Sequence, residues 1–159
     1  LVTGGGQEFG IRSGTENVPY IVGFARAVEI AAKARAREAE RTRALRDKLF
    51  RGIKKILPKA AMNGSPLKAK RLPNHLNVYL PGYRAGELLI ALDRLGVAVS
   101  SGPACASRAP KPPGALLALG IPEERAASSL RISLGRGTTM REIDRMLRIF
   151  NMLLLKSHV

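Results

Sequence analysis

The sequence predicts an α/β fold in which one long helix precedes a small domain with a short sheet. Apolar residues recur at helical spacing through residues 19–57, and short apolar runs at 76–80 and 130–134 are typical of strands. A further helical pattern at 87–95 lies between these two runs. Strands that alternate with helices indicate an α/β arrangement, and 159 residues are enough for one such domain.

The N-terminal part predicts a loop that leads into the long helix. Residues 1–17 are rich in glycine, serine and threonine, which is typical of a loop. Pro19 suits the first turn of a helix because its missing N–H costs nothing there. We therefore expect one long helix, or two in tandem, over residues 19–57, ended by Pro58.

The middle of the chain predicts a strand, a helix and a second strand. The polar segment 59–71 is typical of a connector, and the strand at 76–80 follows it. Leucines recur on one side of the helix at 87–95, and Gly96 suits the left-handed conformation that ends many helices. The apolar residues 97–99 then predict a second short strand.

The C-terminal third predicts a short helix, a strand and a closing amphipathic helix. The short helix covers residues 115–119, and alternating apolar and polar residues predict the strand at 130–134. Residues 140–155 have helical apolar spacing. Thr139 stands before this helix with Glu142 three residues later, which is the spacing of a capping box.

The chain is strongly basic, with 27 Lys and Arg against 12 Asp and Glu and a net charge of +15. Such a charge attracts nucleic acid or another polyanion. It is also typical of a solvated surface, or of a basic half whose acidic partner segment lies outside this chain. Because the chain has no Trp and only 4% aromatic residues, we do not expect a nucleic-acid partner that stacks on it.

Composition also indicates the cellular compartment and excludes some kinds of site. One cysteine can form neither an internal disulfide nor a metal cluster, so we expect no metal and a reducing cytoplasm. No apolar run approaches the roughly 20 residues of a membrane helix. We therefore expect no membrane partner.

Cys105 is the strongest candidate for chemistry. It lies in the segment 100–114, whose four prolines and two glycines exclude regular structure. Arg108 and Lys111 lie close to it in sequence and would favour its thiolate, which is the nucleophilic form. An inert, buried cysteine is an equally open interpretation.

Two further stretches could bind anions. Glycines 4–6, followed by Arg12 and Thr15, have the composition of a phosphate-binding loop, although an ordinary loop before a helix would look similar. Arg131 stands in the strand at 130–134, where a guanidinium can bind a carboxylate with two hydrogen bonds. In a chain so rich in arginine, a simple surface role for Arg131 also stays open.

Four ordered motifs together resemble the cysteine desulfurases, which are class V members of the aminotransferase superfamily that depends on pyridoxal 5'-phosphate (PLP). They are residues 4–19, 71–78, 97–105 and 128–144. Within them, Arg-Ser-Gly-Thr-Glu-Asn at 12–17 and Ser-Ser-Gly-Pro-Ala-Cys at 100–105 are similar to the nitrogen-fixation and iron–sulfur-assembly branch. The chain departs from the family at Pro103, where a serine is common, and at Gly137, which replaces an aromatic residue.

The resemblance implies the C-terminal part of a fold type I PLP enzyme. Residues 1–57 would end the large PLP-binding domain with a phosphate-contacting loop and the long helix, and 58–159 would form the small domain with the cysteine loop 100–114. The lysine that binds PLP covalently would precede Leu1. We therefore expect the isolated chain to be inactive.

The resemblance also implies the reaction and the residue roles. Cys105 would take sulfur from L-cysteine as a persulfide, release L-alanine, and pass the sulfur on for iron–sulfur cluster assembly or tRNA thiolation. Arg131 and Asn74 would bind the substrate. Thr15, and less directly Arg12, would contact the PLP phosphate of the partner subunit in a homodimer. A selenocysteine lyase, another class V enzyme, and a non-catalytic basic or sulfur-relay module stay open as alternatives.

Overall fold

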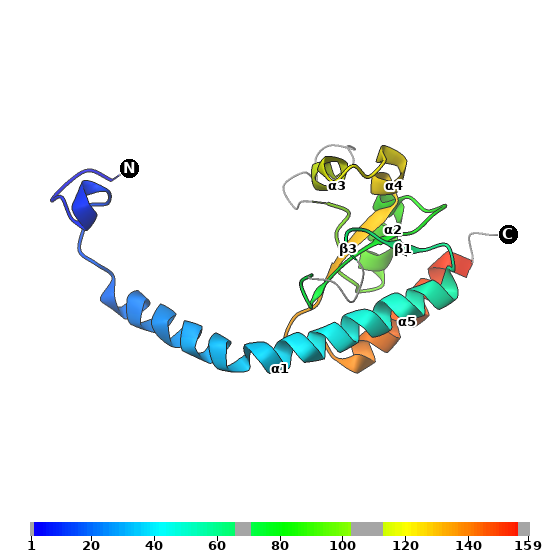
Figure 1. Ribbon diagram of the computed structural model, residues 1–159, viewed down its shortest axis with the longest axis horizontal. Helices are drawn as coiled ribbons and strands as arrows, with labels where there is room; N and C mark the ends of the chain where they lie inside the picture. Colours follow the sequence, from blue (N-terminus) through cyan, green and yellow to red (C-terminus); the bar gives the residue numbers. More distant parts are fainter. Residues whose placement is uncertain (1, 66–70, 103–112, 156–159) are drawn as a thin grey trace. The chain divides into compact units, whose positions relative to one another are not determined.

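The computed structural model describes residues 2–65, 71–102 and 113–155 (Figure 1). The elements are, in chain order, the 3-10 helix η1 (Glu8–Gly10), α1 (Val18–Ile56), β1 (Ala61–Met62), β2 (His75–Tyr79), α2 (Ala85–Arg94), α3 (Gly114–Ala118), α4 (Glu123–Ala127), β3 (Ser129–Ser133) and α5 (Met140–Leu155). The chain forms two compact units, Leu1–Arg37 and Glu38–Val159. The predicted domain division at 57/58 concerns a complete enzyme and stays a prediction.

The second unit is built on a three-stranded antiparallel sheet with the order β1-β2-β3. Apolar side chains of β2 and β3 alternate with polar ones, and the apolar face is buried against the helices. The four sheet residues of this core are at most 3% exposed: Leu76, Val78, Leu130 and Ile132. This mixed helix-and-sheet arrangement confirms the predicted fold class.

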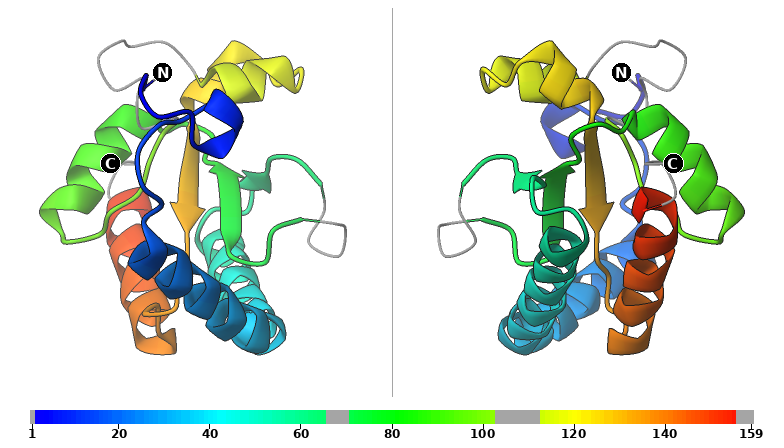
Figure 2. Two further views of the ribbon diagram at one scale, coloured as in Figure 1. Left: turned by 90° about the vertical axis from the view of Figure 1, so that its left-hand side faces the viewer. Right: turned by 90° about the vertical axis from the view of Figure 1, so that its right-hand side faces the viewer.

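The C-terminal half of α1 and α5 lie side by side and complete the core (Figures 1 and 2). Leu45, Leu49 and Ile53 of α1 recur at a spacing of four and are buried, as one face of an amphipathic helix should be. Gly52 lies at the closest approach of the two helices, because a Cβ atom there would lie 2.5 Å from the Leu147 Cδ atoms. Of the two arrangements predicted for residues 19–57, one long helix or two in tandem, the structure has the single helix.

In the first unit, α1 carries its apolar residues without a core of their own. Tyr20 and Phe24 are 78% and 72% exposed, and the only buried residue described before Glu38 is Ser13. Packing within this unit therefore contributes little to the stability of the N-terminal half of the helix.

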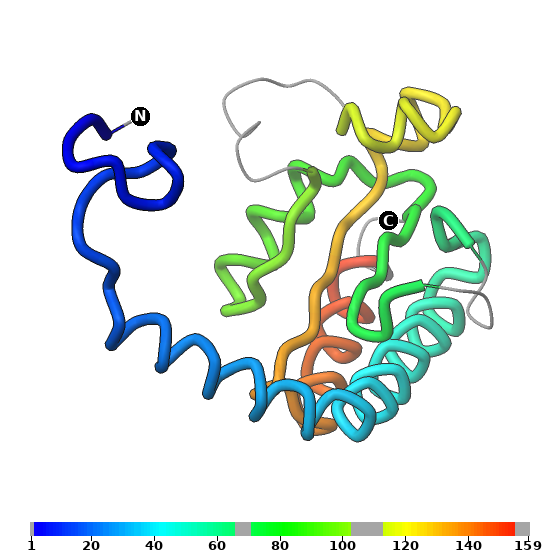
Figure 3. Tube along the Cα trace, turned by 60° about the vertical axis from the view of Figure 1, so that its left-hand side comes forward, coloured from blue at the N-terminus to red at the C-terminus, as the bar shows by residue number. Residues whose placement is uncertain are grey.

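Helix α5 begins with the predicted capping box. The backbone N–H of Thr139 donates to Glu142 Oε2 at 2.6 Å, and the N–H of Glu142 donates to Thr139 Oγ1 at 3.3 Å. The first of these hydrogen bonds is the main reason why the pKa of Glu142 lies below its usual value. Figure 3 shows the chain running along β3, turning, and returning as α5.

The prediction of a strand at 97–99 is wrong. The N–H of Val97 donates to the Leu92 carbonyl at 2.9 Å, so the end of α2 uses the group that a sheet would need. The chain joins β3 only at Ser100, through an isolated bridge to Arg131. The sequence also failed to predict β1, α4 and η1.

None of the helices in the described residues is both long enough and apolar enough to cross a membrane.

Candidate functional site

The face of the sheet opposite the core is polar. Strand alternation places six side chains on it: His75, Asn77 and Tyr79 from β2, and Ser129, Arg131 and Ser133 from β3. The pairing sets Asn77 directly opposite Arg131 and His75 opposite Ser133. This polar face is the candidate site.

Arg131 lies in the middle of the polar face with its guanidinium available. Its main chain pairs with β2 on one side and with Ser100 on the other, where the two N–H···O distances are 2.6 and 3.1 Å. Within residues 2–65, 71–102 and 113–155, no side chain forms a hydrogen bond or ion pair with the guanidinium of Arg131. An arginine held this way presents a fork of donors that matches a carboxylate.

The bridge at Ser100 also fixes the start of the segment that carries Cys105. The Ser100 hydroxyl donates to the carbonyl of Gly102 and accepts from its N–H, so residues 100–102 form a closed turn beside β3. Cys105 itself lies outside the described residues, as do Arg108 and Lys111.

Positive charge dominates the end of the polar face near His75. Burial is the main cause that lowers the pKa of His75 below 6.5, and the charges of Arg71 and Arg131 lower it further. The pKa of Arg71 is also lowered, first by burial and then by Arg46. Because His75 is therefore neutral near pH 7, arginines carry the charge of this region.

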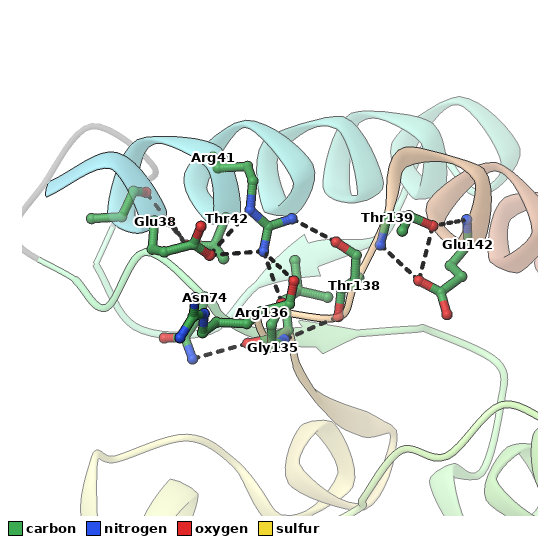
Figure 4. A network of polar contacts seen from close by, with 11 residues as sticks. Glu38, Arg41, Thr42, Asn74, Gly135, Arg136, Thr138, Thr139 and Glu142 are labelled. Atoms are coloured by element: carbon green, nitrogen blue, oxygen red, sulfur yellow. Dashed lines mark hydrogen bonds and ion pairs between the residues drawn. The ribbon is translucent and has the colours of Figure 1, made fainter. Parts of the chain in front are cut away.

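Asn74 closes the end of the β2–β3 pair. Its Nδ2 donates to the Leu134 carbonyl at 3.1 Å, and its own carbonyl accepts from the Leu134 N–H at 2.9 Å. These contacts lie beside the turn that connects β3 to α5 (Figure 4). They give Asn74 a structural contact, and its predicted role in substrate binding stays a prediction.

Arg41 of α1 holds the same turn and could not be predicted from the sequence. Its guanidinium donates to the carbonyls of Gly135, Arg136 and Thr138 at 3.0, 3.0 and 2.6 Å, and it pairs with Glu38 (Figure 4). The partners lie more than ninety residues away in sequence, so no local signal marks the contact. The turn that follows β3 is thereby tied to α1.

The glycine-rich loop of the first unit is organised by its own side chains. Ser13 Oγ accepts from the Gly6 N–H at 3.4 Å, and Arg12 donates to the carbonyls of Gly14 and Thr15 at 2.8 and 3.3 Å. No hydrogen bond of the Thr15 hydroxyl is formed with the described residues. The Thr15 hydroxyl and the remaining N–H groups of Arg12 are therefore the donors that a phosphate could use here.

Among the described residues, no three His, Cys, Asp or Glu side chains come together as a metal site would require.

Comparisons with known proteins agree on one family. The family described as "Aminotransferase class-V" matches residues 4–146. "Cysteine desulfurase IscS 1" of Archaeoglobus fulgidus is 42% identical over 149 residues, and "Cysteine desulfurase IscS" of an Anaeromyxobacter species is 48% identical over 146 residues. These matches cover 94% and 92% of this chain but only 38% and 35% of the two relatives.

Solved structures give the same result. A structure described as a NifS-like protein has a TM-score of 0.79 at 36% identity, and a NifS-like protein of Rickettsia africae has a TM-score of 0.77 at 30% identity. Each match covers 98% of this chain and 39% of the other chain. The chain thus spans about two-fifths of the length of the proteins that it matches.

Proposed function

Because this chain belongs to the class V aminotransferase family, we propose that it forms part of a cysteine desulfurase, an enzyme that takes sulfur from L-cysteine. The resemblance seen in four ordered motifs is confirmed by the family match and by relatives with 42–48% identity. The rival interpretations have no better support: a selenocysteine lyase, another class V enzyme, and a basic binding or sulfur-relay module.

The backbone pairing of Ser100 with Arg131 carries the proposal. It puts the start of the cysteine segment directly against the strand that carries Arg131, whose guanidinium has no partner among the described residues. In our proposal Arg131 binds the substrate carboxylate, and Cys105, five residues after Ser100, reacts with the substrate sulfur. In this proposal the pairing with β3 holds the start of the segment that carries the nucleophile next to the arginine that binds the substrate.

The proposed reaction needs an ionised thiol at residue 105. Its thiolate attacks the sulfur of L-cysteine, and an S–S bond forms as the substrate C–S bond breaks. The substrate carbon keeps the electron pair of the broken bond and takes up a proton, which gives L-alanine and leaves Cys105 as a persulfide. PLP, when bound, would supply the electron sink that stabilises negative charge on the substrate during this reaction.

The chemistry of the glycine-rich loop is compatible with the phosphate end of PLP. The Thr15 hydroxyl and the guanidinium of Arg12 are donors, and both side chains are exposed. Glycines at 4, 6 and 14 adopt positive φ angles, which bring the backbone into the tight loop. We propose that Thr15, assisted by Arg12, holds the phosphate of the partner subunit in a homodimer.

The persulfide must leave on an acceptor, and we propose a protein of iron–sulfur cluster assembly or of tRNA thiolation. A single cysteine with no partner for an internal disulfide is typical of a reducing compartment, so we place the protein in the cytoplasm.

The test uses the protein as its gene encodes it, loaded with PLP. L-cysteine should yield L-alanine and sulfide in equal amounts when a reductant is present. Cys105→Ser should abolish both, and Ser101→Ala, which keeps the thiol, is the matched control. Faster alanine release from selenocysteine than from cysteine would favour a lyase. Absence of alanine, with nucleic-acid binding that falls steeply with salt, would favour the basic module.

A further inference from the structure

The amide of Asn77 lies beside Arg131 on the polar face of the sheet. The two residues are direct partners in the antiparallel pair of β2 and β3, and both are half-buried. Side chains at such paired positions have Cβ atoms about 4.5–5.5 Å apart. A ligand that touches one of them is therefore within reach of the other.

A chain of hydrogen bonds fixes which way this amide points. Arg125 Nε donates to Asn63 Oδ1 at 2.8 Å, and a guanidinium can only donate, so the oxygen of Asn63 must face it. Asn63 Nδ2 therefore faces Asn77 and donates to its Oδ1 at 2.7 Å. Since Asn77 has its oxygen turned toward Asn63, its NH2 group must point the other way.

The Asn63 and Ser129 side chains, which help to impose this orientation, are buried and fully hydrogen-bonded. Asn63 and Ser129 are 3% and 0% exposed, and Asn63 Nδ2 also donates to Ser129 Oγ at 2.8 Å. The Ser129 hydroxyl donates a hydrogen bond to the Arg125 carbonyl at 2.7 Å, and the Arg125 guanidinium lies 5.1 Å from the centre of the Tyr79 ring. Each polar side-chain atom of Asn63 and Ser129 thus has a partner, and a fully paired buried network holds one arrangement.

The exception is the Asn77 NH2 group, which has no acceptor in residues 2–65, 71–102 and 113–155. Arg131, its partner across the strand pair, offers only donors as well. Two adjacent donor groups suit the two oxygens of a carboxylate.

We propose that Asn77 binds the substrate carboxylate together with Arg131, and that Asn63 and Arg125 are positioning residues that orient the Asn77 amide. The inference rests on the proposed function, because it takes L-cysteine as the substrate that supplies the carboxylate. Asn77 thereby adds a neutral donor of fixed direction beside the charge of Arg131.

Two nearly isosteric substitutions test this orientation. Asn77→Asp keeps an oxygen for Asn63 Nδ2 but replaces the NH2 group beside Arg131 with a second carboxylate oxygen. Asn63→Asp keeps the acceptor for Arg125 but turns an oxygen toward Asn77, so the Asn77 amide must flip and present its oxygen to the ligand. Asn151→Asp, on the exposed side of α5, is the matched control for the change in charge.

The measurement is calorimetric binding to the protein as its gene encodes it, loaded with PLP. The two probes are L-alanine and ethylamine, which is alanine without its carboxylate. Asn77→Asp should weaken L-alanine binding by about tenfold or more, the amount that a hydrogen bond to a charged group contributes. Asn63→Asp should weaken it in the same direction. Ethylamine binding should change in neither variant, and Asn151→Asp should change neither probe.

The outcomes separate this inference from the proposed function. Unchanged L-alanine binding in Asn77→Asp would overturn it, and so would an equal loss for ethylamine, which would mean a merely structural role. If Asn77→Asp weakens L-alanine binding and Asn63→Asp leaves it unchanged, the positioning role of Asn63 is overturned. Sulfide release from L-cysteine by the unaltered protein is scored separately. If sulfide is absent while L-alanine binding responds as expected, the desulfurase proposal fails and the carboxylate site stands.

Discussion

Gly52 lies where α1 passes closest to α5, and replacing it with alanine tests how tightly the two helices are packed. The new Cβ atom would stand 2.5 Å from both Cδ atoms of Leu147 and 3.0 Å from its Cγ. Carbon atoms in ordinary contact are about 3.5–4.0 Å apart, so the leucine or the helix must move. Overpacking of this kind costs about 1–3 kcal/mol.

A second effect of the same substitution has the opposite sign. Alanine is favoured over glycine inside a helix by about 1 kcal/mol, and this gain applies whether or not Leu147 is present. The net change for Gly52→Ala alone is therefore small, and a single variant would be uninformative. The two effects separate when Gly52→Ala is compared in the unaltered chain and in a Leu147→Ala background.

The assay is urea unfolding of the four proteins of this double-mutant cycle. In the Leu147→Ala background we expect Gly52→Ala to raise the free energy of unfolding by about 1 kcal/mol, because only the helix preference remains. The coupling between the two positions should be about 1–3 kcal/mol. If Gly52→Ala has the same effect in both backgrounds, the inferred close contact is wrong.

Three further predictions follow from contacts of the second unit. Arg41→Ala should lower the free energy of unfolding by about 1–2 kcal/mol, since three carbonyls of the β3–α5 turn lose their donor; Arg43→Ala, on the exposed side of α1, is the control in the same urea series. The pKa of Glu142 is lowered in the folded protein, so its stabilising effect is present above its usual pKa near 4.5 and is lost as the pH falls through the lower folded value. Glu142→Gln should flatten that part of the pH profile, and an unchanged profile would contradict the capping box. The pKa of His75 is also lowered from 6.5, but here the folded state disfavours the proton, so stability should decline as the pH falls below about 6.5. An NMR titration that finds the pKa of His75 at or above 6.5 would refute the argument from burial and the two arginines.

Local patterns predicted those elements whose cause is local. The capping box depends on two residues three apart, and the long helix on a repeat of apolar residues within α1. Alternation over residues 130–134 predicted β3 and set Arg131 apart from the apolar residues on either side of it. The resemblance then supplied its role as a carboxylate ligand, which spacing by itself left open.

Other features could not be predicted, because they depend on residues that are distant in the sequence. The two residues of β1 form a strand only because β2 lies beside them, and residues 97–99 fail to form one because α2 takes the N–H of Val97. The contact of Arg41 with the turn after β3 joins parts of the chain that are distant in sequence. Cys105 was predicted from its segment, and its placement lies outside the described residues.

The sequence by itself determined the main helices α1, α2 and α5, the strands at 76–80 and 130–134, the family and the candidate arginine, because periodicity and motifs are properties of neighbouring residues. Only the tertiary structure decided which way the Asn77 amide points. That orientation is transmitted from Arg125 through Asn63, and these residues lie in separate segments that meet only when the sheet forms. A guanidinium that can only donate settles the orientation of each amide after it, and this constraint exists only once the three side chains touch.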